Sequence, residues 1–286
     1  ENLTLSNSNI LSSSASSGGG ISSDGTLTVR DSSVLANYGR GISVGDSSTI
    51  TVTNSTVRDN DSTGISVRDS STTTVTNSTV RDNSGRGIFV GSSGTATVTN
   101  STVRDNDSQG IFASTYSTVS VSNSTISGNS TSGSGGGFRA DEYANVDVTD
   151  STISGNSAYD GGGFFADDYA NVDVTDSTIS GNSVSDDGGG IYADNNSTVT
   201  INNSTISDNF ASDNGGGIRN DGRTNVNNST ISNNSGSEEG GGISTAGVTN
   251  LTNSIISGNR GNDGNEVIRF DGTINSNGNN LFGDSD

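Results

Sequence analysis

The sequence predicts an all-β fold, a right-handed parallel β-helix (solenoid) of about 11–12 coils with three strands per coil. Two observations predict it. A signature of the form Asn/Asp-Ser-Thr-Ile/Val-x-x-Asn recurs every 23–27 residues along nearly the whole chain. Each period also holds three short apolar–polar alternations separated by turn residues, which is typical of three strands and no helix. Parallel crossovers favour the right-handed form.

The core of each coil comes from one apolar position on each strand. The first strand begins after a Gly, and its inward positions are Ile42, Ile65, Ile88, Ile111, Phe138, Phe164, Ile191, Ile218 and Ile243. Those of the second strand are Val52, Val75, Val98, Val121, Val148, Val174, Ile201, Val226 and Leu251. The Ile or Val of the signature supplies the third. Only 26% of the 286 residues are hydrophobic, which suffices because each coil buries its face on its neighbours.

Two columns of Asn or Asp accompany the strands. One is expected at a tight bend between the second and third strands, because these residues tolerate a left-handed backbone. Its members are Asn54, Asn77, Asn100 and Asn123, continued by Asp150, Asp176, Asn203, Asn228 and Asn253. The other closes the third strand, at Asn60, Asn83, Asn106, Asn129, Asn156, Asn182, Asn209, Asn234 and Asn259. We interpret both columns as structural ladders, in which stacked side chains bond along the axis.

Composition excludes several classes of site. Without Cys, the chain has no disulfide or thiolate chemistry, and without His it lacks the usual general base and zinc ligand. A net charge of −20 repels nucleic acid and anionic membranes. No apolar run approaches the length of a membrane span. We therefore expect no nucleic-acid partner and no direct membrane insertion.

Residues 1–286 are predicted to form one solenoid domain in three regions. The coils of 1–122 have short loops, those of 123–260 have longer loops before the Gly run, and 261–286 form a terminal coil. Glu1–Leu5 already has the pattern of a second strand, so the chain starts in mid-coil. Since solenoids need capping turns, we expect the chain to be a segment of a longer protein, or a unit that self-associates head-to-tail or laterally.

The Ile-Ser-Gly-Asn and Gly-Gly-Gly-Ile motifs resemble the FxxN and GGAI repeats of polymorphic outer-membrane proteins. The tail from Asp271 to Asp284 is similar to the closing coil of bacterial choice-of-anchor surface proteins. The resemblance covers nearly the whole chain. It implies a secreted, extracellular or cell-surface β-helix, and it carries little information about activity.

The first strand also has an outward column that is rich in aromatic and Arg residues. Its candidate ligand-binding positions are Phe89, Phe112, Arg139, Phe165, Tyr192 and Arg219. Exposed aromatic rings at coil spacing suit stacking on sugar rings or on a partner protein. This column is therefore the predicted binding platform for surface glycans or proteins.

Acidic residues flank the platform in the later coils. One column follows the strand, at Asp141, Asp167, Asp194 and Asp221. Carboxylates stacked about 4.8 Å apart repel one another unless cations lie between them. Oxygen ligands in turns suit calcium. These four residues are therefore a candidate calcium site, and calcium is the one cofactor that the sequence suggests.

Three functions are compatible with these features. The preferred one is a non-enzymatic structural or adhesive element: a stalk, passenger or fibre element. The first alternative is a glycan-binding or glycan-processing lyase or hydrolase that uses paired carboxylates on the first-strand face. No catalytic residue is assigned, because acidic residues that repeat with the coil are typical of ladders. A remote alternative is ice binding by the Thr rows that begin at Thr51 and Thr53.

Overall fold

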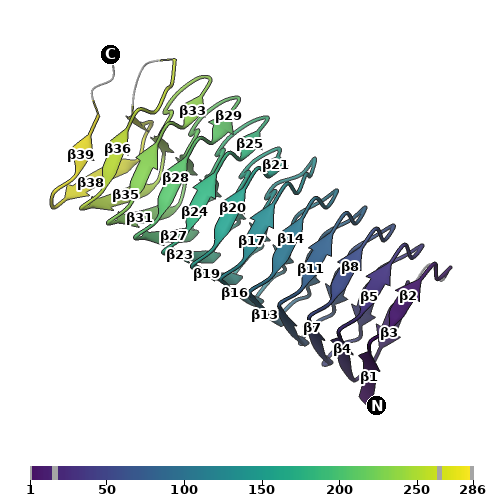
Figure 1. Ribbon diagram of the computed structural model, residues 1–286. Helices are drawn as coiled ribbons and strands as arrows, with labels where there is room; N and C mark the ends of the chain where they lie inside the picture. Colours follow the sequence, from purple (N-terminus) through teal and green to yellow (C-terminus); the bar gives the residue numbers. More distant parts are fainter. Residues whose placement is uncertain (1, 15–18, 263–265, 284–286) are drawn as a thin grey trace.

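The computed structural model describes residues 2–14, 19–262 and 266–283 and shows a straight β-solenoid of about eleven turns (Figure 1). The described strands form three long parallel sheets, with β1 and β39 at opposite ends of the rod. This confirms the predicted all-β solenoid with three strands per coil. The described part of the chain contains no helix long and apolar enough to cross a membrane.

The second strand of each coil belongs to sheet A. Its members are β1 (Asn2–Ser6), β4 (Thr26–Arg30), β7 (Thr49–Thr53), β10 (Thr72–Thr76), β13 (Thr95–Thr99), β16 (Thr118–Ser122), β19 (Asn145–Thr149), β23 (Asn171–Thr175), β27 (Thr198–Asn202), β31 (Arg223–Asn227), β35 (Val248–Thr252) and β38 (Thr273–Asn277). Five-residue strands with β-branched residues at alternate positions suit a sheet that is buried on one face.

The third strand of each coil belongs to sheet B. Its members are β2 (Asn9–Leu11), β5 (Ser33–Leu35), β8 (Thr56–Arg58), β11 (Thr79–Arg81), β14 (Thr102–Arg104), β17 (Thr125–Ser127), β20 (Thr152–Ser154), β24 (Thr178–Ser180), β28 (Thr205–Ser207), β32 (Thr230–Ser232), β36 (Ile255–Ser257) and β39 (Leu281–Phe282).

The first strand of each coil belongs to sheet C. Its members are β3 (Ile21–Ser23), β6 (Ile42–Val44), β9 (Ile65–Val67), β12 (Ile88–Val90), β15 (Ile111–Ala113), β18 (Phe138–Ala140), β22 (Phe164–Ala166), β26 (Ile191–Ala193), β30 (Ile218–Asn220), β34 (Ile243–Thr245) and β37 (Val267–Arg269).

The predicted core columns are superposed along the axis. Val75 pairs with Val52 on one side and with Val98 on the other, and all three are completely buried. Phe138 and Phe164 stack with their ring centroids 4.6 Å apart and their planes within 4°. Like residues therefore pack on like residues along one continuous core.

The Asn column that closes the third strand is a buried ladder. Between Asn37 and Asn259, each Nδ2 donates to the Oδ1 of the next coil's Asn at 2.8–3.0 Å. The same Oδ1 accepts the backbone N–H of the preceding Asn, as between Asn106 and Asn83. At the C-terminal end Glu266 replaces the amide, and its carboxylate accepts the Nδ2 of Asn259 at 2.6 Å.

The Asn column between sheets A and B differs from this ladder, which corrects the expectation of two equivalent ladders. Asn54, Asn77, Asn100 and Asn123 have φ near +50°, as predicted for the bend, but their side chains are exposed. Among the described residues, the axial side-chain bond between two Asn of this column joins Asn77 and Asn54, at 3.3 Å. The column acts mainly through its backbone conformation.

A Ser ladder beside this bend was not predicted. The Oγ of Ser55 accepts the N–H of Ser32 at 3.1 Å and donates to the carbonyl of Thr53 at 2.7 Å. The same arrangement recurs at Ser78, Ser101 and their successors. The Ser that follows Asn or Asp in each signature is the sequence signal for it, because a small hydroxyl there satisfies two buried backbone groups.

The longer loops before the Gly runs form a fourth, short sheet. Sheet D consists of β21 (Ser157–Ala158), β25 (Ser183–Val184), β29 (Phe210–Ala211) and β33 (Ser235–Gly236). Its buried residues Ala158, Val184 and Ala211 form a small apolar cluster of their own. The added residues therefore continue the solenoid order and form a wall beside sheet C.

The buried Asn ladder predicts a large stability difference between the two Asn columns. Asn106→Ala removes the acceptor of two N–H groups on Asn83 and the donor to Asn129. Leaving these buried groups unpaired should lower the free energy of unfolding by about 2–4 kcal/mol. Urea denaturation followed by circular dichroism measures the change.

Asn100→Gly is the matched control, because Asn100 lies in the same coil and glycine adopts its φ of 49° without strain. Its effect should stay within about 0.5 kcal/mol. Equal losses for the two variants would contradict the assignment of the ladder role to the buried column.

Candidate functional site

The outward face of sheet C carries the predicted binding platform, between sheet D on one side and the turns to sheet A on the other. The structure corrects one property of it: Phe112 and Phe165 are only 8% and 7% exposed. The guanidinium of Arg86 lies 4.2 Å from the centroid of the Phe112 ring. That of Arg139 lies 5.2 Å from the centroid of Phe165. Arginine side chains therefore cover the rings that the sequence predicted to be exposed.

The other two aromatic rings of the platform, Phe89 and Tyr192, each contact one of the covered rings. Phe89 lies 5.6 Å from Phe112, and Tyr192 meets Phe165 edge to face at 5.2 Å. Cation–π and edge-to-face contacts of this kind stabilise partly desolvated rings. The column is thus a continuous strip of mutually packed side chains.

Arg139 joins two members of the predicted calcium column. Its Nε lies 2.7 Å from Asp141 and its Nη2 lies 2.9 Å from Asp167 of the next coil. The two carboxylates directly follow β18 and β22, which places them on the same edge of sheet C as the Arg side chain. A guanidinium therefore occupies the position between carboxylates that the sequence assigned to a cation.

Arg219 makes the corresponding contacts further along the rod. Its Nη2 lies 2.9 Å from Asp221, and its guanidinium lies 5.0 Å from the centroid of the Phe270 ring. The Tyr192 hydroxyl donates to Asp221 at 2.8 Å. Burial, followed by the Asp221 carboxylate, raises the pKa of Tyr192, so this hydroxyl keeps its proton and acts as a donor.

Asp194 is the member of the column that makes no ion pair with a described Arg. Its Oδ1 accepts the backbone N–H of Asn195 at 2.7 Å. Burial raises its pKa, and the nearby Asp167 carboxylate adds to the effect. The four predicted ligands therefore do not converge on one point, and the calcium prediction for them remains untested.

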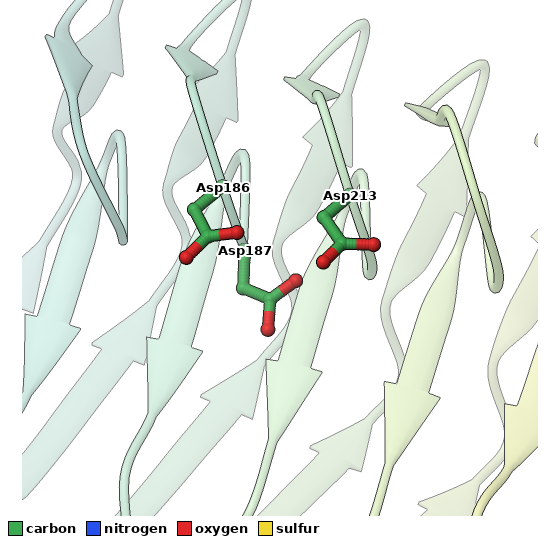
Figure 2. Close-up of side chains that lie close together, drawn as sticks. All are labelled: Asp186, Asp187 and Asp213. Atoms are coloured by element: carbon green, nitrogen blue, oxygen red, sulfur yellow. The ribbon is translucent and has the colours of Figure 1, made fainter.

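A second acidic group lies where the loops of sheet D lead into sheet C. Asp186, Asp187 and Asp213 each offer a carboxylate oxygen, and these atoms lie within 4.8 Å of one another (Figure 2). In Figure 2, Asp186 and Asp187 belong to one coil and Asp213 to the next. We call these three residues the acidic cluster. Sequence reasoning assigned no site to it, although Asp186 and Asp213 occupy one column, in which the backbone N–H of Asp213 donates to the carbonyl of Asp186.

Neighbouring carboxylates and partial burial disfavour ionisation here. Burial raises the pKa of Asp160 to about 6, and Asp186 and Asp187 contribute. Burial also raises the pKa of Asp187 and Asp213, the latter with a contribution from Glu238. Partly protonated carboxyl groups at short separation can bind a divalent cation by oxygen coordination or can exchange protons.

Comparisons with known proteins identify the fold but no close relative. The family described as "Right handed beta helix region" matches residues 1–102 and 86–281. No curated protein and no solved structure matches the chain significantly.

The raised pKa of Asp160 predicts a pH dependence of stability. The folded state ionises this carboxyl near pH 6 and the unfolded chain near pH 3.8. The folded state therefore gains stability from the protonated form of Asp160. This gain is fully present below pH 3.8 and is lost as the pH rises through about 6. Because the side chain is only partly buried and solvent screens it, we expect a loss of about 1 kcal/mol.

Asp160→Asn should remove this part of the pH dependence, and it should be more stable than the parent protein at about pH 8. Thermal unfolding between about pH 4 and 8 measures it. Asp147→Asn, which changes the same charge at an exposed position of β19, is the control. An unchanged profile for Asp160→Asn would contradict the role of this carboxyl.

Calcium binding gives a test that separates the two acidic groups. If calcium binds, it should raise the melting temperature by a few degrees at millimolar concentration. Asp187→Asn abolishes the shift if the acidic cluster holds the ion, whereas Asp194→Asn abolishes it if the predicted column does. Equal melting temperatures in calcium and in chelator would remove both assignments.

Proposed function

Because the chain belongs to the right-handed β-helix family, we propose that it is a non-enzymatic structural or adhesive rod of an extracellular or cell-surface protein. About eleven turns at the usual strand spacing give a length of about 55 Å. The location is supported by the resemblance of its repeats to those of surface proteins, and the partners would be surface glycans, proteins or further copies of the chain.

One observation carries this proposal: the charged and polar side chains on the outward face of sheet C form ion pairs and hydrogen bonds with one another. Arg139 forms ion pairs with both Asp141 and Asp167, and Arg219 and Tyr192 both contact Asp221. A catalytic site needs unlike groups that converge on a substrate and are free to react. Paired side chains that repeat with the coil contribute to the stiffness of a rod instead.

The acidic cluster supports the alternative, a glycan-processing enzyme. Two carboxyl groups about 5 Å apart serve as acid and nucleophile in retaining glycosidases. Carboxylate oxygens of Asp186, Asp187 and Asp213 lie within 4.8 Å of one another, at that separation or closer. The ice-binding alternative has weaker support, because the Thr rows of sheet A give way to Ser120, Asp147 and Asp173.

The two functions differ in a polysaccharide degradation assay. The rod proposal expects no release of reducing ends or unsaturated products from neutral or acidic polysaccharides, with or without calcium. Release that disappears in Asp187→Asn and persists in Asp147→Asn would establish the enzyme instead. Small-angle scattering of the same sample should give a rigid rod, whichever function holds.

A further inference from the structure

Three tyrosines form an exposed stack at the turns that lead from sheet C to sheet A. Tyr143 lies between Tyr116 and Tyr169, with centroid distances of 4.9 Å and interplanar angles of 7° on both sides. The exposed fractions of Tyr116 and Tyr169 are 59% and 44%. All three side chains are attached to a left-handed backbone, with φ between 58° and 61°.

This conformation is unfavourable for an aromatic residue, and the same position holds Ser47, Ser70 and Ser93 in earlier coils. Backbone strain at bulky residues is retained where the surroundings hold the side chain for a purpose. Stacking restricts the rotation of each ring, so the terminal ring is preorganised before any ligand arrives. We call these three residues the tyrosine stack.

The chain changes its turn length just beyond Tyr169. Four residues connect sheets C and A at positions 167–170 and 194–197, but only two do so at Asp221–Gly222 and Ala246–Gly247. The backbones of successive short turns pack closely on each other, because a Cβ on Gly247 would lie 2.0 Å from the carbonyl oxygen of Gly222. The edge of the rod therefore steps inward after the coil of Asn196.

A hollow of about 450 Å³ lies at this step. The residues that line it include Tyr169, Asn196, Thr198, Asp221, Arg223 and Gly247. One face of the Tyr169 ring is covered by Tyr143. The face that Tyr143 leaves free is directed toward Asn196, the smaller residue at the same turn position of the next coil, and both residues line the hollow. Arg223 and Asn196 are exposed, and Arg223 forms no ion pair with a described carboxylate.

We propose that this hollow binds one pyranose ring of a glycan chain. The free face of Tyr169 offers an aromatic surface to the C–H groups of the sugar. The Arg223 guanidinium, the Asn196 amide and the Thr198 hydroxyl supply donors and acceptors for its hydroxyls. A rigid aromatic wall with a few polar groups at its edge, in a volume within the usual range of ligand sites, is the arrangement that small-molecule sites use.

The site is separate from the sheet C face and does not depend on whether the rod is enzymatic. It rests on the part of the proposed function that names surface glycans as partners, and it adds a location for one sugar ring. Soluble and surface-attached glycans share the C–H groups and hydroxyls that this hollow would contact. Soluble oligosaccharides are therefore suitable probes.

The test is NMR titration of the intact chain with defined oligosaccharides: cello-, manno-, galacto- and xylo-oligomers at millimolar concentration. The chain contains six Tyr, so their ring signals can be resolved and assigned by substitution. At least one of these oligosaccharides should shift the Tyr169 signals. If none does, the proposal is overturned.

Two stack-end variants make the experiment specific. Tyr169→Ala should weaken binding about tenfold, since it removes the aromatic wall. Tyr116→Ala is the matched control: it removes one stacking contact at the same strained φ but lies at the far end of the stack, so the affinity should stay within about twofold. Tyr169→Phe should keep the affinity of the parent, and Arg223→Gln should reduce it. Equal affinities for the two Ala variants would place the sugar elsewhere and overturn the assignment.

Discussion

The structure depends on one constraint: backbone hydrogen bonds between parallel strands place each side chain directly over its equivalent in the next coil. A residue type is then compatible with a column only if it packs well on itself. Aliphatic side chains do so through contact, and phenylalanines through stacking. Asn does so because its amide offers a donor on one side and an acceptor on the other. The buried ladder from Asn37 to Asn259 is the polar equivalent of the aliphatic core.

The same constraint makes columns of like charge unfavourable. Two carboxylates stacked one coil apart repel each other, and each disfavours the ionisation of the other. The chain reduces this repulsion in two ways. Arginine separates the acids at Asp141 and Asp167. Where no Arg side chain lies between the acids, as at Asp160, burial and then the neighbouring Asp186 and Asp187 carboxylates raise the pKa, to about 6. The acidic face is therefore a mixture of neutralised and protonatable groups, and its net charge depends on pH.

The repeat makes the fold predictable from sequence, because a period defines which residues share a column. The strands, the core positions such as Val75 and Val98, and the left-handed bends at Asn54 follow from it. The covering of Phe112 by Arg86 does not, since Arg86 lies in a turn whose side-chain direction no period defines. For a similar reason, the sequence did not distinguish the exposed side chain of Asn54 from the buried side chain of Asn60. Both columns have the same spacing, and only the bend geometry separates them.

A perfectly regular solenoid repeats every surface feature at each coil, so it offers a ligand no unique place to bind. Specific sites can form only where the period changes. The aromatic column ends at Tyr169, where the smaller Asn196 takes the next position, and the turn shortens by two residues in the coil after that. The hollow lies where these two changes meet. The acidic cluster likewise lies in the region where longer loops enter the coils. We infer that in this chain the regular coils supply stiffness, and the irregular ones carry recognition.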